Sequence, residues 1–392
     1  MVQGREENGV LFLSISGKID SSNAADIERQ MQALRKQHPC ESIELDCDQL
    51  EYATSAGLRI ILRLKQEVDN TVLVNVHPDL YNIFDMTGFT DMMEVRRAYR
   101  VLSVEGCEVI GQGANGKVYR IDPDTILKVY LNPHALPEIH RERELARMAF
   151  VAGVPTAIPY DVVRIKSGGF GSVYELLNAD SFAKLLINGK KTLDEVVEMS
   201  IRLLKLIHSK EIKSDILPDM KAVALNWAEF LRDYLPSEAF EKLLALISAV
   251  PADSHLIHGD FHLKNIMLQN GESLLIDMDT LSHGHPIFEL ASMYNAYVGF
   301  GLTDPEQQMA FLGIPHTTCE SLWRKSLEAY LGTQDARILD EVEAKARIIG
   351  LTRLMRREIR RDGLNREDGL RMIEACRATL LDLIPRVATL VF

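Results

Sequence analysis

The chain has 392 residues, of which 46% are hydrophobic and 26% are charged, and its formal net charge is −12. This length predicts two or three domains, and the acidic balance argues against a nucleic-acid partner. No apolar run approaches the ~20 residues of a membrane span, and the opening residues MVQGREENGV lack a secretory signal pattern. We therefore expect a cytoplasmic protein. Five widely spaced cysteines without a CxxC motif argue against a disulfide framework and a zinc site.

Residues 8–96 alternate between strand-like and helix-like patterns. VLFLSISG, SIELDCD and TVLVNV favour strands, whereas AGLRIILRLKQEV has apolar residues at helical spacing. Strands that alternate with helices predict a small α/β domain. We place this domain at residues 1–98 and a linker at residues 99–104.

Two segments of this front region resemble STAS domains of the anti-sigma-factor-antagonist type. SGKIDSSNA is similar to their G-x-L-D region, and YATSAGLRIIL is similar to the D-S-x-G-L turn that carries a phosphorylatable serine. By position that serine is Ser55, although Thr54 replaces the usual aspartate. Ser55 is therefore either a phosphosite at a helix start or a simple helix N-cap. The resemblance implies a regulatory or partner-binding module without chemistry of its own.

A different pattern begins near residue 105 with two strand-like segments around a glycine-rich turn. Gly111, Gly113 and Gly116 fit G-x-G-x-x-G and are followed by Val118. Glycines at these positions permit positive φ and let backbone N–H groups approach phosphate oxygens. Because a strand rather than a helix follows, the pattern favours the nucleotide loop of protein kinases over a dinucleotide fold.

A lone lysine, Lys128, interrupts the next apolar strand, ILKVYL. In protein kinases a lysine on this strand pairs with the α- and β-phosphates and is held by a glutamate on a helix. The helix-like segment IHRERELARMAF offers Glu142, which we favour, and Glu144 as the alternative. Lys128 could instead face solvent from a half-buried strand, and either glutamate could be a solvated helix charge.

The segment HGDFHLKN, residues 258–265, has the residue types and spacing of a kinase catalytic loop. Asp260 lies five residues before Asn265, and Asp277 follows in LLIDMD. Asp260 would accept the proton of an attacking hydroxyl, while Asn265 and Asp277 would bind Mg²⁺. A strand pair between Asn265 and Asp277 would bring them to one edge, and Asp279 would share the metal or shape the loop.

A rival interpretation uses the same segment as a transition-metal site. His258, Asp260 and His262 alternate along the chain, and His283 and His285 add further ligands. A metallohydrolase would not need the upstream glycine loop and its lysine. We therefore favour histidines that fix the loop by hydrogen bonds.

The motifs HGDFHLKN, LLIDMD and GHPIFELASMY resemble the aminoglycoside phosphotransferase and choline kinase-like family over about residues 105–385. The resemblance implies a two-lobed α+β protein-kinase-like fold, with the N-lobe and hinge at residues 105–180 and a helical C-lobe at residues 181–392. In the hinge segment VYELLNA, Glu175 and Leu177 would present backbone groups to the adenine ring.

Three residues depart from the family pattern and cast doubt on a close substrate analogy. Met278 replaces an aromatic residue, and His285 and Glu289 stand where a G-D-P…D-L-A segment is usual. His208 in LLKLIHS also matches a family helix, and we interpret it as a buried structural histidine. We interpret the basic run at residues 353–361 as a solvated helix face, and the aromatic residues of the helical half as core.

Together these patterns predict an ATP- and Mg²⁺-dependent phosphotransferase that acts on a small-molecule hydroxyl, with a regulatory STAS domain. The acidic composition would suit a cationic acceptor. Two alternatives remain: a protein kinase that phosphorylates Ser55, and a nucleotide-binding adaptor without catalysis.

Overall fold

The computed structural model describes residues 2–7, 9–113, 115–212 and 216–392. The chain divides into two compact units, Met1–Glu105 with Val162–Gly171, and Gly106–Asp161 with Ser172–Phe392. Within the described ranges, no helix is both long and apolar enough to cross a membrane.

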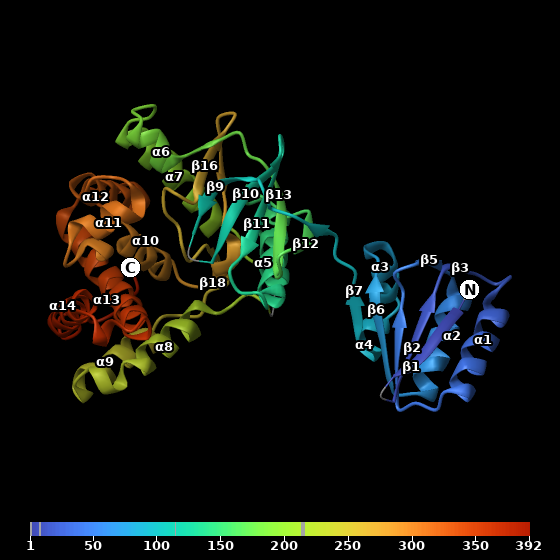
Figure 1. The fold of residues 1–392 in the computed structure, drawn as a ribbon. Helices are drawn as coiled ribbons and strands as arrows, with labels where there is room; N and C mark the ends of the chain where they lie inside the picture. Colours follow the sequence, from blue (N-terminus) through green and yellow to red (C-terminus); the bar gives the residue numbers. More distant parts are fainter. Residues whose placement is uncertain (1, 8, 114, 213–215) are drawn as a thin grey trace. The chain divides into compact units, whose positions relative to one another are not determined.

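The first unit is built on a five-stranded sheet with the order β1-β2-β4-β6-β7, in which β1 is antiparallel to β2 and the other neighbours are parallel. Figure 1 shows α1 and α2 side by side against this sheet. Strands β3 and β5 form a short parallel pair, and both come before α2 in the sequence. The strands are β1 Val2–Glu7, β2 Val10–Ile15, β3 Gly17–Ile19, β4 Ser42–Asp46, β5 Leu50–Ala53, β6 Asn70–Val76 and β7 Val95–Arg97; the helices are α1 Ala24–Gln37, α2 Ser55–Glu67, α3 Pro78–Met86 and α4 Phe89–Met92.

The fold of this unit follows from the alternation of buried residues along its strands and from the close packing of α2 on β3. Leu11, Leu13 and Ile15 are buried on β2 at a period of two, as a sheet with one face on the core requires. Gly57 in the first turn of α2 lies so close to β3 that a Cβ atom there would be 2.9 Å from the Cβ of Ile19. The alternating strands and helices confirm the predicted α/β class.

The predicted linker, residues 99–104, contains a strand of its own. β8, Val101–Leu102, pairs in parallel with β12, Asp161–Ile165, with Val101 opposite Arg164. The rings of Tyr99 and Phe170 meet edge to face nearby, with centroids 5.3 Å apart. These contacts explain why residues 162–171 belong to the first unit.

The second unit begins with antiparallel strands in the order β13-β11-β10-β9, followed by small strand pairs and a large helical region (Figure 1). α10 is buried along its whole length and packs against α13, so it forms the centre of the helical region. The strands are β9 Glu108–Gln112, β10 Gly116–Asp122, β11 Thr125–Tyr130, β13 Phe170–Glu175, β14 Asp180–Ser181, β15 Leu256–Ile257, β16 Ile266–Gln269, β17 Glu272–Leu275 and β18 Ser282–His283.

The helices of the second unit agree with the periodicity of the sequence. α7 begins with a capping box in which the Thr192 and Glu195 side chains each bond the other residue's backbone N–H. The helices are α5 Leu136–Val151, α6 Phe182–Ile187, α7 Leu193–His208, α8 Met220–Phe230, α9 Ser237–Ser248, α10 Ile287–Tyr297, α11 Pro305–Leu312, α12 His316–Leu331, α13 Ala336–Arg360 and α14 Glu367–Leu383, with single turns η1 Arg232–Tyr234, η2 Met278–Thr280, η3 Gly299–Gly301 and η4 Gly363–Asn365.

Candidate active site

The glycine loop joins β9 to β10, as the sequence predicts, but its glycines do not adopt positive φ, and close packing requires glycine only at Gly116. None of Gly111, Gly113 and Gly116 has a positive φ. A Cβ atom at Gly116 would lie 2.4 Å from the carbonyl oxygen of Val129 on β11, so only glycine fits there. A Cβ atom at Gly113 would meet nothing within 4 Å, which leaves open space beside the loop.

Lys128 lies opposite Val118 on the neighbouring strand and forms two ion pairs. Its Nζ is 2.9 Å from Glu142 Oε1 on α5 and 2.8 Å from Asp277 Oδ1. Glu144 instead pairs with Arg147. The structure therefore brings Lys128 to Glu142, and the solvent-facing interpretation of Lys128 is wrong, because only 17% of its side chain is exposed.

Glu142 is buried and fully engaged. The hydroxyl groups of Tyr130 and Tyr174 donate to its two carboxylate oxygens at 2.7 Å and 3.1 Å. Burial alone would lower the pKa of Lys128, but the charges of Asp277 and Glu142 outweigh burial and raise this pKa above its ordinary value. The lysine is thus a fixed positive charge.

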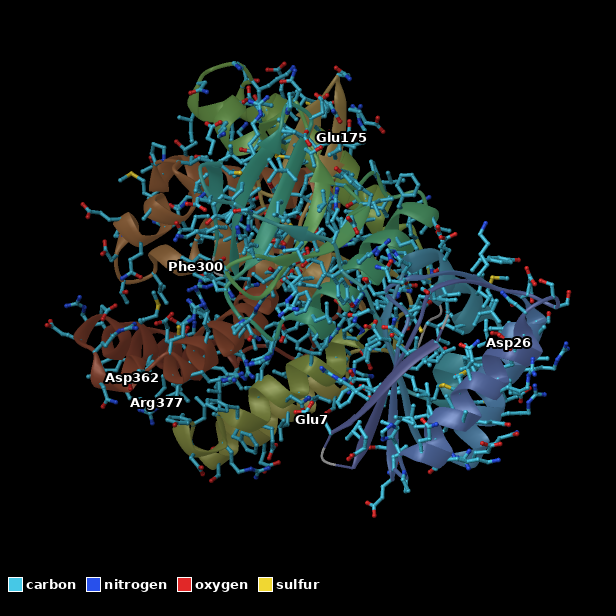
Figure 2. All side chains as sticks on the ribbon, turned by 45° about the vertical axis from the view of Figure 1, so that its right-hand side comes forward. Glu7, Asp26, Glu175, Phe300, Asp362 and Arg377 are labelled. Atoms are coloured by element: carbon cyan, nitrogen blue, oxygen red, sulfur yellow. The ribbon has the colours of Figure 1, made fainter. Side chains whose placement is uncertain are left out.

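The predicted hinge residues lie where β13 ends. Glu175 is the last residue of β13 (Figure 2), and Leu177 follows in the connection to β14. The N–H of Leu176, between them, donates to the carbonyl oxygen of Asp124. The Leu177 N–H makes no hydrogen bond to any described residue, so it remains available to a ligand.

The catalytic loop lies between β15 and β16 and is tied to the strands around it. As predicted, a hairpin of β16 and β17 brings Asn265 and Asp277 to the same edge, and the N–H of Ile276 donates to the Asn265 carbonyl at 2.9 Å. The Asn265 side-chain amide donates to the Asp260 carbonyl at 3.0 Å. The side-chain oxygen of Asn265 makes no hydrogen bond to any described residue.

Asp260 is held as a carboxylate. Burial alone would raise its pKa, but a hydrogen bond from His262 and the charges of His262 and Arg353 outweigh burial and lower the pKa below its ordinary range. His262 Nε2 is 3.4 Å from Asp260 Oδ2, and 40% of the Asp260 side chain is exposed. The carboxylate is therefore both ionised and reachable.

Asp277 and Asp279 form an acidic pair beside Lys128. Asp277 has a φ of 66°, a left-handed conformation that is uncommon for a residue other than glycine and is often found at functional sites. Burial, and then the charges of Asp277 and Glu142, raise the pKa of Asp279 to about 7. The side-chain amide of Asn115 in the glycine loop donates to Asp279 Oδ2 at 3.3 Å.

The transition-metal interpretation is wrong. No group of three or more histidine, cysteine, aspartate or glutamate side chains is arranged to hold a metal in the ranges that the structure describes. His258 instead accepts a hydrogen bond at Nδ1 from the Asp260 N–H, and its Nε2 lies 3.3 Å from the carbonyl oxygen of Ile276. His283 Nδ1 lies 2.8 Å from the carbonyl oxygen of Asp253.

Glu289, a departure from the family pattern, holds the catalytic loop through its backbone. Its fully buried carboxylate accepts hydrogen bonds from the N–H groups of His258 and Gly259. Burial alone would raise the pKa of Glu289, but His208, His258 and the Gly259 N–H lower it. His208 is buried, as expected, but it lies beside the motifs: its Nε2 is 3.9 Å from Glu289 Oε2.

Gly259 shows how tightly the loop is enclosed. Its φ is 80°, and a Cβ atom would lie 2.7 Å from the carbonyl oxygen of Thr280. Its own carbonyl oxygen accepts from Ser292 Oγ at 2.8 Å and from Arg353 Nη1 at 2.9 Å. Sequence reasoning missed Ser292 and Arg353, because each lies on a helix whose local pattern indicates only helix.

Ser55 is the first residue of α2 and is exposed. The N-cap is Thr54, whose N–H and hydroxyl both donate to the carbonyl oxygen of Ile19. The interpretation of Ser55 as a simple N-cap is therefore wrong. No side chain caps the helix, and its first turn contains no acidic residue.

Comparisons with known proteins match both halves of the chain. Residues 106–320 match the phosphotransferase enzyme family, and residues 2–101 match the STAS domain. The STAS domain and the kinase-like α+β domain agree with the predicted fold class.

The curated relatives match the front domain. A putative anti-sigma factor antagonist, BtrV, from Bordetella bronchiseptica is 29% identical over 92 residues, which is 22% of this chain and 78% of the relative. An anti-sigma F factor antagonist from Paenibacillus polymyxa is 26% identical over 98 residues, which is 24% of this chain and 84% of the relative.

Solved structures similar to this chain include ADP-bound aminoglycoside phosphotransferase APH(2'')-Ib, with a TM-score of 0.48, 15% identity and coverage of 79% of this chain and 99% of that one. A choline/ethanolamine kinase family protein from Mesorhizobium loti has a TM-score of 0.47, 14% identity and coverage of 71% and 87%.

Proposed function

Because the chain belongs to the phosphotransferase enzyme family, we propose that it transfers the γ-phosphoryl group of ATP, with Mg²⁺, to a hydroxyl group of a small molecule. The observation that carries this proposal is Lys128, which is held between buried Glu142 and Asp277. A fixed cation next to a glycine loop and a carboxylate provides charge stabilisation for a phosphoryl group without reorganisation.

The donor atoms around Asp277 fit a magnesium ion. Mg²⁺ prefers hard oxygen ligands and is commonly held by one or two protein groups together with substrate phosphates. The amide oxygen of Asn265 accepts no hydrogen bond from a described residue. Asp277 offers a carboxylate and follows Ile276, whose N–H donates to the Asn265 carbonyl. When bound there, Mg²⁺ would neutralise charge on the phosphates, and Asp279, whose carboxyl group interacts electrostatically with Asp277, would be a further candidate ligand.

The chain's own residues would carry out the remaining steps. The backbone of the glycine loop and Lys128 would orient the phosphates, and the Glu175 carbonyl and Leu177 N–H would hold the adenine ring. Asp260 would accept the proton of the acceptor hydroxyl while the hydroxyl oxygen bonds to the γ-phosphorus. The bond from the γ-phosphorus to the β–γ bridging oxygen would break, and ADP would leave with that oxygen.

The test is nucleotide consumption by the full chain with Mg²⁺ over a panel of aminoglycosides, sugars and amino alcohols, with ATP and GTP in parallel. We expect acceptor-dependent turnover that Asp260→Asn lowers by about 10²- to 10⁴-fold, the usual contribution of a general base. Lys128→Met should raise the Kd of nucleotide, while Lys166→Met, at an exposed lysine, should leave it unchanged. Nucleotide binding that is equal in all variants would contradict the proposal.

We further propose that the STAS domain regulates this activity through Ser55. A phosphate on this exposed side chain would lie next to the uncapped N–H groups of the first turn of α2, where negative charge is favourable. After incubation with ATP and Mg²⁺, phosphopeptide mapping should find the Ser55 peptide modified, and Ser55→Ala should remove the signal. An unmodified Ser55 would exclude phosphorylation by the chain itself and leave a partner kinase as the source.

A further inference from the structure

The basic run at residues 353–361 is only partly a solvated helix face. Arg353 lies three residues before Arg356 and four before Arg357 on α13, so its side chain adjoins both of theirs, and all three are half-buried. Arg360 and Arg361 are exposed, as the sequence predicts. The first three residues are called the arginine face below.

Each guanidinium of the arginine face lies over an aromatic ring. The distance from the guanidinium carbon to the ring centroid is 5.4 Å for Arg353 over Trp227, 5.6 Å for Arg356 over Phe230, and 4.8 Å for Arg357 over Phe300. Trp227 and Phe230 come from α8, and Phe300, which is labelled in Figure 2, comes from η3. A ring beneath the guanidinium holds its position and leaves its N–H edge for an oxyanion.

Of the carboxylates near this face, Glu358 and Asp260 act on Arg357 through their charges. Among the described residues, none of the three arginines forms an ion pair, and the buried Nε of Arg356 has no hydrogen-bond partner. Glu358, the acidic residue of the run, pairs with Arg366. Burial, and then the charges of neighbouring arginines, lower the pKa of both Arg356 and Arg357. Arg356 and Arg357 are half-buried and have neither an ion pair nor a hydrogen bond to a described residue, which favours binding of an anion.

The arginine face lies beside the catalytic base rather than the nucleotide lysine. Arg353 donates to the carbonyl oxygen of Gly259, one residue before Asp260, and its charge contributes to the low pKa of Asp260. The charge of Asp260 in turn acts on Arg357. α13 packs against α8, α10, α12, α14 and η3, all in the helical region. An anion on this face would therefore be on the acceptor side of the reaction.

We propose that the acceptor is a small alcohol that also carries a phosphate or carboxylate group, which Arg356 and Arg357 bind while the hydroxyl approaches Asp260. This inference rests on the proposed function and gives its substrate class. It reverses the expectation from net charge, because the −12 of the whole chain says nothing about the sign of one face. A guanidinium whose N–H groups have no protein acceptor matches the planar, two-oxygen geometry of these anions.

The test compares four matched small alcohols: glycerol phosphate, glycerate, glycerol and choline. Their binding to the full chain is measured by calorimetry, with and without saturating Mg²⁺ and a non-hydrolysable ATP analogue. We expect glycerol phosphate or glycerate to bind at least about 10-fold more tightly than glycerol and choline. The preferred anion identifies which group the natural acceptor carries.

Charge-removing variants locate the binding. Arg356→Gln and Arg357→Gln should each weaken anion binding by at least about 10-fold, and Arg357→Lys should weaken it less. Arg360→Gln removes the same charge from the exposed side of the helix and should have little effect. The same pattern should appear in the KM of transfer, with smaller changes in kcat.

Three results would overturn the inference: no saturable binding of either anion, tighter binding of choline, or equal losses in Arg357→Gln and Arg360→Gln. Failure of the proposed function is distinct. It would appear as a lack of analogue binding or of Asp260-dependent transfer, while the titration without nucleotide still reports on the arginine face.

Discussion

The catalytic loop and the Ser55 turn both follow a short strand, but they are held in different ways. The peptide groups of His258 and Gly259 are bonded by Glu289 and Ser292 from the buried helix α10 and by Arg353 from α13. At the Ser55 turn, Thr54 bonds to Ile19 on β3, and Ser55 itself is exposed.

This difference separates two kinds of site. A loop bonded on both its N–H and carbonyl sides can keep reacting groups in one geometry, which catalysis by positioning requires. A turn that is anchored only at its base leaves its side chain accessible to modification or to a partner. The variants below test how far each site depends on its anchors.

Among the variants that remove an anchoring contact, the largest effect is expected from Asp277→Asn. This change removes the carboxylate that pairs with Lys128 and that we assign to Mg²⁺. The kcat should fall by about 10²- to 10³-fold, and the Mg²⁺ concentration for half-maximal rate should rise. Steady-state assays over a range of Mg²⁺ would measure both. Asp124→Asn, at an exposed aspartate, is the matched control, and a similar loss there would refute the assignment.

A smaller effect is expected from Glu142→Gln, because Lys128 keeps Asp277 as a second partner. Removing the buried charge should raise the KM for nucleotide by on the order of 10-fold. Glu144→Gln, two residues along α5, breaks only the surface pair with Arg147 and should change the KM by less than about 2-fold. If both variants behaved alike, Glu142 would have no special role in nucleotide binding.

Glu289→Gln tests the support beneath the catalytic loop. Glutamine keeps the shape but weakens the two backbone hydrogen bonds, so the free energy of unfolding should fall by about 1–3 kcal/mol. The kcat should change by a larger factor than the KM for nucleotide, because the catalytic loop would shift while the nucleotide-binding residues would keep their positions. Urea unfolding and steady-state kinetics would measure these effects. Glu289→Asp restores the residue that the family pattern expects and should recover most of the activity.

Much of this architecture can be predicted from the sequence, because its motifs are local. The glycine loop, Lys128, Asp260 and Asn265 are each recognisable within a few residues. The choice between Glu142 and Glu144 is not, because both lie on the same helix. It depends on Tyr130 and Tyr174, which come from two strands and enclose only Glu142.

The arginine face shows the same limit. Its charges are evident in the sequence, but whether α13 turns them to solvent depends on Trp227, Phe230 and Phe300, which are far away along the chain. Glu289 is visible only as a departure from a motif, and its role depends on loop peptides 30 and 31 residues before it. Tertiary packing, rather than residue type, decides these roles.

The smallest effects are expected at the Ser55 turn. Thr54→Ala removes the hydroxyl that donates to the Ile19 carbonyl, so the first unit should lose about 1 kcal/mol of stability. Ser55→Ala should change it by less than about 0.5 kcal/mol, because the side chain is exposed and caps nothing. Tryptophan fluorescence would not report on this unit, because both tryptophans, Trp227 and Trp323, lie in the second unit. Hydrogen exchange of peptides from α2 would measure the stability of the first unit. If Ser55→Ala lost more stability than Thr54→Ala, Ser55 would be a structural residue. Folding rather than regulation would then explain why a serine stands at this position.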